Sequence, residues 1–131
     1  MSDSDADDIE AIRERKREQL QNAASVPEEP IHVEGNDHLQ SLVADYDVVL
    51  VDFYADWCGP CKMLEPTVET LAAETPAAVA KVDVDAHQAI AREFNVQGVP
   101  TLVLFADGSA AEQMVGVKDE QTLRQLVDSY T

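Results

Sequence analysis

The stretch that decides the fold runs from residue 48 to residue 62 and reads VVLVDFYADWCGPCK. Its first seven residues, 48–54, form a nearly continuous apolar run, which is typical of a central strand buried on both faces. Cys58 and Cys61 follow this strand and are the only cysteines of the chain. A Cys-x-x-Cys pair within strand–helix–strand patterning predicts a redox site.

The spacing of the two cysteines has a geometric reason. If Cys58 begins a helix, Cys61 lies one turn further along the same face, at a spacing that allows a disulfide. The unpaired N–H groups and the positive end of the helix favour the thiolate of Cys58, which is the nucleophilic form. Pro60 fits the first helical turn, where its missing N–H costs little. We therefore predict Cys58 as the nucleophile and Cys61 as the resolving thiol.

Strand and helix patterns alternate on both sides of this stretch. From residue 31 onward the predicted order is β-α-β-α-β-α-β-β-α, which is typical of an α/β fold whose partly parallel sheet ends in an antiparallel hairpin. The dipeptide Asp107-Gly108 indicates the hairpin turn. The first helix is expected to take Asn36 or Asp37 as its cap. The last, at 119–130, is expected to turn Leu123, Leu126, Val127 and Tyr130 inward.

Residues 1–30 differ from the rest of the chain. Residues 1–8 are rich in Asp and Ser and are expected to be disordered, whereas residues 9–24 contain helix formers and neither Gly nor Pro. Residues 26–30 read VPEEP, which breaks a helix and predicts a linker. We therefore predict an acidic, charged N-terminal extension at 1–30 and one globular domain at 31–131. Two interpretations of the helix stay open: a solvated appendage, which its thin apolar stripe favours, and a docking or dimerising helix.

The charge of the chain excludes several classes of partner. It carries 26 acidic and 9 basic residues, a net charge of −17. Neither nucleic acid nor an anionic membrane is an expected partner, because both need a basic patch. Residues 1–8 lack the pattern of a secretory signal, so a cytoplasmic protein is expected. Such acidity at least confers solubility, and we favour the further interpretation that the protein is adapted to high salt, which screens like charges.

Two segments of the chain resemble the thioredoxin family. Residues 51–62 resemble its active-site segment, and residues 98–105, which read GVPTLVLF, resemble the segment that faces the cysteines. The resemblance covers roughly residues 31–131 and leaves out the first thirty. It implies the thioredoxin fold, an α/β fold with a central mixed sheet flanked by helices. It also implies no metal and no cofactor other than the redox-active disulfide Cys58–Cys61.

Asp52 interrupts the apolar strand. Burial disfavours the charged form of a carboxyl and raises its pKa, which suits proton exchange near neutral pH. In thioredoxins the matching Asp assists proton transfer at the resolving cysteine, and Lys81 matches a Lys that neighbours this Asp. The alternative is an Asp that faces water at the end of a strand.

Three residues around the sulfurs, Trp57, Gly59 and Pro60, are candidates for contact with partner proteins. An exposed aromatic side chain at position 57 would offer apolar area to a partner, whereas the alternative is a Trp in the core.

The dipeptide Val99-Pro100 resembles the cis-proline turn of the family. The bend would leave the Val99 backbone free to pair with an extended substrate, whereas the alternative is an ordinary trans loop. Gly98 and Gly116 match small residues beside that groove, and this assignment rests on the resemblance alone.

The resemblance implies a protein-disulfide reductase, expected to be a monomer, that is recharged by a thioredoxin reductase and acts on disulfide-containing target proteins. A disulfide oxidant or isomerase is the first alternative, and the dipeptide Gly59-Pro60 argues against it. A non-catalytic binding module is the second, and the presence of Cys58, Cys61, Asp52 and Pro100 argues against it. A structural disulfide across two residues would stabilise little, and the three histidines show no zinc-finger spacing to the cysteines.

Overall fold

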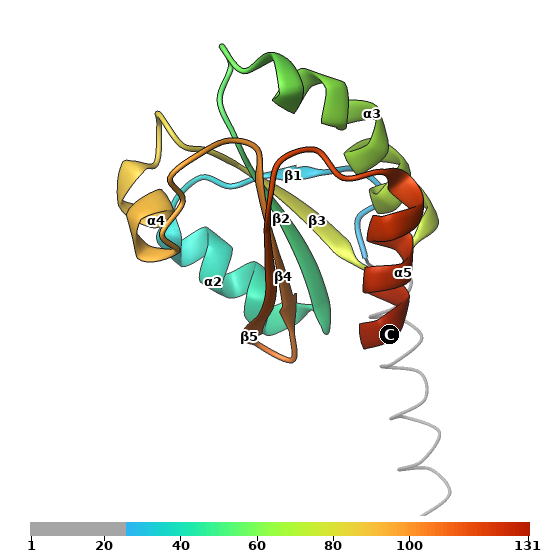
Figure 1. Ribbon diagram of the computed structural model, residues 1–131. Helices are drawn as coiled ribbons and strands as arrows, with labels where there is room; N and C mark the ends of the chain where they lie inside the picture. Colours follow the sequence, from blue (N-terminus) through green and yellow to red (C-terminus); the bar gives the residue numbers. More distant parts are fainter. Residues whose placement is uncertain (1–25) are drawn as a thin grey trace, which may run out of the picture.

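The computed structural model describes residues 26–131, so the predicted disordered segment 1–8 and the predicted helix 9–24 lie outside the described residues. The described elements follow one another in the predicted order (Figure 1). They are β1 (Ile31–His32), α2 (Asn36–Asp45), β2 (Val48–Tyr54), α3 (Gly59–Glu74), β3 (Ala78–Asp83), α4 (Gln88–Glu93), β4 (Thr101–Ala106), β5 (Ser109–Val115) and α5 (Glu120–Tyr130).

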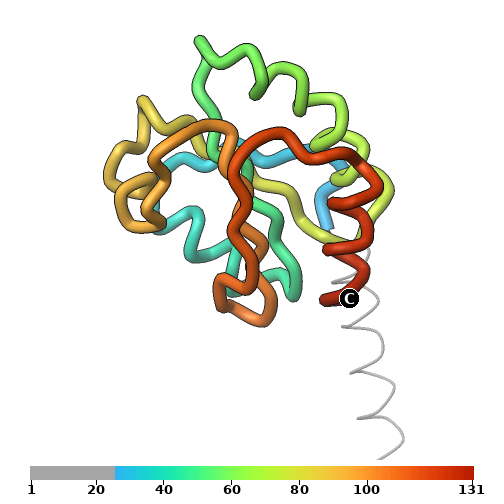
Figure 2. Tube along the Cα trace, viewed as in Figure 1, coloured from blue at the N-terminus to red at the C-terminus, as the bar shows by residue number. Residues whose placement is uncertain are grey.

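The strands form one sheet in the order β1-β3-β2-β4-β5. β1, β3 and β2 run parallel, whereas β4 is antiparallel to both β2 and β5. Figure 2 shows the trace of β1 beside that of β3, although some fifty residues separate them in the sequence. The predicted mixed sheet is confirmed, but its antiparallel part includes the β2–β4 pair as well as the predicted hairpin.

Helices cover both faces of the sheet, α2 and α4 on one side and α3 and α5 on the other (Figure 1). The alternation of side chains along β2 explains this layering. Val49, Val51 and Phe53 pack with the α2 side chains, whereas Val48 and Leu50 pack with those of α3 and α5. β2 is therefore buried on both faces, as its apolar run predicts.

The same alternation places the polar residues of the core. Asp52 shares the face of Val48 and Leu50, and it lies level with Lys81 in the β2–β3 register. Lys81 in turn shares the face of Val79, which packs beneath α3. Both polar side chains therefore belong to the layer between the sheet and α3, the helix that carries Cys61.

Two expectations about helices are wrong. Neither Asn36 nor Asp37 caps α2, because the helix already includes both residues. Gly35 occupies the cap position, and among the described residues no side-chain hydrogen bond caps the helix there. Tyr130 does not turn inward, since it lies at the end of α5 and donates from its hydroxyl to Glu112 on exposed β5, at 3.0 Å. Leu123 and Val127 are buried as expected, and Leu126 packs against the same core.

Val26, the first described residue, packs against the core cluster on the α2 side of the sheet. The division into 1–30 and 31–131 stays a prediction, and a truncation that tests it should retain Val26. No helix within 26–131 is long and apolar enough to cross a membrane.

Candidate redox site

Cys58 and Cys61 lie at the start of α3, where they are joined by a disulfide. Cys58 is the N-cap residue of the helix and Pro60 lies in its first turn. The backbone N–H of Cys61 donates to the sulfur of Cys58 over 3.1 Å. In the reduced protein this N–H and the end of the helix favour a negative charge on Cys58, because both present positive charge to the sulfur.

A loop far away in the sequence closes over the two sulfurs. The Val99–Pro100 peptide bond is cis, so the alternative of a trans loop is wrong. The carbonyl oxygen of Val99 lies 3.7 Å from the sulfur of Cys58, and Val99 packs against the small cluster of Ala55, Cys58 and Cys61. The loop thus presents backbone polar groups directly beside the sulfur of Cys58.

The glycines of the predicted groove differ in their structural role. Gly116 has a φ of +93°, a left-handed conformation that favours glycine, and its N–H donates to the carbonyl of Pro100 at 2.8 Å. The carbonyl of Gly98 accepts the Thr101 hydroxyl at 2.6 Å. A Cβ added at Gly98 or Gly59 would meet nothing within 4 Å, so packing inside the described chain does not require glycine there.

Trp57 is 72% exposed beside the disulfide, so the alternative of a core Trp is wrong. Its indole N–H donates to Asp85 at 2.9 Å, which fixes the orientation of the ring. Met63, on the first turns of α3, is similarly exposed. Two large apolar side chains thus flank the cysteines on the surface.

Asp52 is fully buried, so the alternative of a water-facing Asp is wrong. Neither of its carboxyl oxygens has a hydrogen-bond partner among residues 26–131. Burial raises its pKa from 3.8 to about 6; the Lys81 charge opposes this rise and the Glu65 charge adds to it. A carboxyl with such a pKa can gain and lose a proton close to neutral pH.

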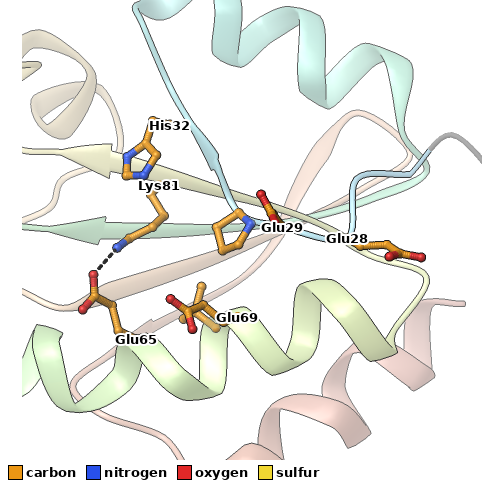
Figure 3. Close-up of a pocket in the computed structure, with 8 residues that line it drawn as sticks. Glu28, Glu29, His32, Glu65, Glu69 and Lys81 are labelled. Atoms are coloured by element: carbon orange, nitrogen blue, oxygen red, sulfur yellow. Dashed lines mark hydrogen bonds and ion pairs between the residues drawn. The ribbon is translucent and has the colours of Figure 1, made fainter.

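Lys81 is buried, and its ammonium group pairs with Glu65 at 3.1 Å, as the dashed line in Figure 3 marks. The same nitrogen lies 4.3 Å from the centre of the Tyr54 ring. Cys61, Glu65 and Lys81 line one open cleft of about 190 Å³. The structure thus brings the predicted neighbour of Asp52 and the predicted resolving cysteine to a common solvent opening.

Sequence reasoning missed Glu65 and Asp85. The position of Glu65 four residues after Cys61, on one face of a helix, was a usable signal. Asp85 follows β3 in a turn, and nothing in its local sequence points to Trp57. Within residues 26–131 no group of three or more His, Cys, Asp or Glu side chains is arranged to hold a metal ion.

Fold and site together define a class of protein. A mixed sheet between two helix layers carries a disulfide at a helix start, and a cis-proline loop faces the sulfurs. These are the features of a dithiol–disulfide oxidoreductase with the thioredoxin fold.

Comparison with known proteins places the chain more closely. The thioredoxin family model matches residues 30–129. A thioredoxin from Chlamydia muridarum is 44% identical over 101 residues, which cover 76% of this chain and 98% of that relative. A solved mutant thioredoxin from Halobacterium salinarum NRC-1 is 60% identical, with a TM-score of 0.80 over 82% of this chain and 95% of the other. The chain belongs to the thioredoxin family.

Membership confirms the predicted fold and the predicted chemistry. Thioredoxins are protein-disulfide oxidoreductases, and the Cys58–Cys61 pair of this chain has the geometry for dithiol–disulfide exchange. The likeness to a Halobacterium protein supports the salt adaptation that the charge of the chain predicts.

Proposed function

We propose that this chain is a cytoplasmic, monomeric reductase of disulfides in target proteins, recharged by a thioredoxin reductase. One observation carries the proposal: the Cys58–Cys61 disulfide at the start of α3 lies directly beside the backbone of Val99. A disulfide in this position can be reached by an extended partner segment and can exchange electrons with it.

The exchange takes two steps. The thiolate of Cys58 attacks one sulfur of a target disulfide, forms a mixed disulfide and expels the other target sulfur as a thiolate. Cys61 then loses its proton and attacks Cys58, which closes the Cys58–Cys61 disulfide and releases the second target thiolate. Two electrons pass to the target, and its two thiolates take up two protons. A reductase returns both electrons to the protein by the reverse sequence.

Asp52 is the proposed proton acceptor for Cys61. It lies in the layer between the sheet and α3, and its carboxyl, which has no hydrogen-bond partner among residues 26–131, has a pKa raised to about 6 by burial. Lys81 is its proposed neighbour and limits that rise. The proton reaches Asp52 directly or through water in the cleft that Cys61 and Lys81 line.

The proposed surface for target proteins surrounds the sulfurs. Trp57, Gly59 and Pro60 are all exposed beside the disulfide and offer a target protein contact area. On the opposite side Val99 offers backbone groups beside the cis bond to Pro100, with Gly98 next to it in the chain and Gly116, which follows β5, bonded to the Pro100 carbonyl. The open space at Gly98 and Gly59 leaves room for a partner backbone.

Reduction of insulin tests the proposal. With dithiothreitol as electron source and molar KCl in the buffer, the protein should accelerate precipitation of the insulin B chain. A purified thioredoxin reductase should replace dithiothreitol. Oxidation of a reduced peptide at a higher rate than insulin reduction would instead identify a disulfide oxidant, and no effect on insulin would identify a binding module.

We expect Asp52→Asn to be more stable than the wild type at pH 7.5 and equally stable at pH 3.5. Below pH 3.8 the carboxyl is protonated in both the folded and the unfolded chain. Between about pH 4 and pH 6 only the unfolded chain loses the proton, so the stability of the wild type falls as pH rises. Above about pH 6 both states have lost the proton, and this fall in stability is complete. The rise from 3.8 to about 6 corresponds to about 3 kcal/mol, an upper limit for the gain.

Urea unfolding at constant salt measures this gain, and insulin reduction should be slower in the variant at pH 7 because Cys61 has lost its proton acceptor. Asp47→Asn, which removes an exposed carboxylate just before β2, at the end of the strand away from the cysteines, is the matched control and should change neither quantity. Equal stability of Asp52→Asn and wild type at both pH values would contradict the assignment.

A further inference from the structure

Glu65 has no role in the exchange as proposed so far, yet it holds the one buried cation of the described chain. The ammonium of Lys81 lies 3.1 Å from its carboxylate, and the Lys81 side chain is only 7% exposed. Glu65 itself is 51% exposed, on the turn of α3 that follows Cys61. The ion pair therefore joins the helix of the cysteines to the strand beside Asp52.

The neighbouring carboxyl of Asp52 has no hydrogen-bond partner within the described part of the chain. Asp52 and Lys81 are level in the β2–β3 register and share a face of the sheet, yet no donor reaches either oxygen of Asp52 among residues 26–131. A desolvated ammonium group needs an anion or a polar acceptor nearby. In this structure Lys81 finds them in Glu65 and the Tyr54 ring and does not bond to Asp52.

We propose that Glu65 is a positioning residue: its ion pair holds the Lys81 ammonium group at the mouth of the cleft and away from the Asp52 carboxyl. Asp52 therefore keeps its proton to a higher pH than it would if Lys81 bonded to it. This inference rests on the proposed role of Asp52 in the exchange. It adds a residue of α3 that sets the pH above which the Asp52 carboxylate can accept a proton.

The surrounding charges support a specific role for Glu65. The Lys81 charge lowers the pKa of Asp52 and the Glu65 charge raises it. Loss of Glu65 therefore removes the negative charge that raises this pKa and leaves the Lys81 charge, which lowers it, free to approach Asp52. Burial and the nearby carboxylates raise the pKa of Tyr54, which therefore stays neutral. The other titratable groups of the cleft and of the adjoining groove beneath α3 are Asp56, Lys62, Glu69, Glu28, Glu29 and His32.

Glu69 provides a matched control. It lies one turn further along α3 and is exposed, and Figure 3 shows it beside Glu65 without a bond to Lys81. Its replacement by Gln removes the same charge from the same helix and leaves the ion pair in place. An effect of Glu65→Gln that Glu69→Gln does not share therefore belongs to the pair and not to net charge.

The test is a titration of Asp52 in the oxidised protein, in which no thiol titrates. The carboxyl carbon of Asp52 is followed by NMR from pH 4 to pH 9 at constant molar KCl. We expect Glu65→Gln to lower the midpoint by about half a pH unit or more, because a nearby anion is lost. Glu69→Gln should leave the midpoint unchanged, and Lys81→Met should raise it.

A double variant separates action through Lys81 from direct repulsion. In the Lys81→Met background, Glu65→Gln should lower the midpoint by clearly less than it does in the wild type. An equal shift in both backgrounds, an unchanged midpoint in Glu65→Gln or a higher one would overturn the proposal. Glu65→Ala repeats the comparison should the Gln variant fold poorly.

The kinetic consequence is measured on the release of a target from its mixed disulfide. At pH 5 the Glu65→Gln protein should release it about two- to threefold faster than the wild type, with equal rates at pH 8, as follows from a half-unit change of the midpoint. If Asp52→Asn slows release but Glu65→Gln moves neither the midpoint nor the rate, only the role of Glu65 is wrong. If Asp52→Asn has no effect on release, the proposed function of Asp52 fails instead.

Discussion

Replacement of Cys58 by Ser should abolish disulfide reduction, lowering the rate by roughly a thousandfold or more, because a hydroxyl is not ionised at neutral pH as a thiolate is. Replacement of Cys61 by Ser should have a different effect. The variant still attacks targets through Cys58 but cannot resolve the product, so mixed disulfides with targets accumulate. Insulin turbidity measures the first effect, and non-reducing electrophoresis with mass spectrometry of the linked peptide measures the second.

The position of Cys58 at the N-cap of α3 is the reason for this assignment. The helix end and the Cys61 N–H both favour its thiolate, whereas Cys61 lies within the first turn and lines the cleft toward Lys81. Alkylation of the reduced wild type should therefore label Cys58 before Cys61. Faster labelling of Cys61, or mixed disulfides that accumulate on Cys61 in Cys58→Ser, would reverse the two roles.

The second large effect concerns salt. We expect the free energy of unfolding to rise steeply with KCl up to molar concentrations. Residues 31–131 carry 17 acidic and 5 basic side chains, a net charge of −12. Two like charges about 10 Å apart repel by about 0.4 kcal/mol in water without salt, so many such pairs together cost several kcal/mol. The Debye length falls from about 10 Å at 0.1 M to about 3 Å at 1 M, which removes most of this cost.

Urea unfolding of the oxidised protein at a series of KCl concentrations measures the effect. Sucrose at matched osmolality is the control, because it leaves the charges unscreened. A chain that begins at Val26 should keep the dependence, since most of the excess charge lies within the described residues. Stability that does not change between 0.1 M and 2 M KCl would contradict salt adaptation of this surface.

Local pattern was enough to predict most of the fold. The apolar run of 48–54 predicted a strand buried on both faces, and the Cys-x-x-Cys spacing predicted a helix that begins at Cys58. Position 36 was harder, because Asn and Asp cap helices well, yet α2 already includes both residues and the extended Gly35 takes the cap position. The antiparallel β2–β4 pairing was also missed, since strand direction depends on how the chain returns after α4 and not on local residue type.

The candidate site was less predictable where it depends on tertiary contacts. Asp52 stood out because a carboxyl within an apolar strand is costly, and the exposure of Trp57 followed from its place beside the cysteines. The bond of Trp57 to Asp85 joins residues 28 apart, and the Glu65–Lys81 pair joins a helix to a strand. No local pattern encodes such pairs, because an acidic chain offers many carboxylates that could accept from Trp57 or pair with Lys81.

One measurement tests the central claim most directly: a single turnover of the reduced protein with insulin, in molar KCl and without any other reductant. Thiols on insulin and the redox state of Cys58 and Cys61 are counted together by alkylation and mass spectrometry. We predict that one insulin disulfide is reduced for each Cys58–Cys61 disulfide that forms. Insulin that stays oxidised while both cysteines stay reduced would contradict the account.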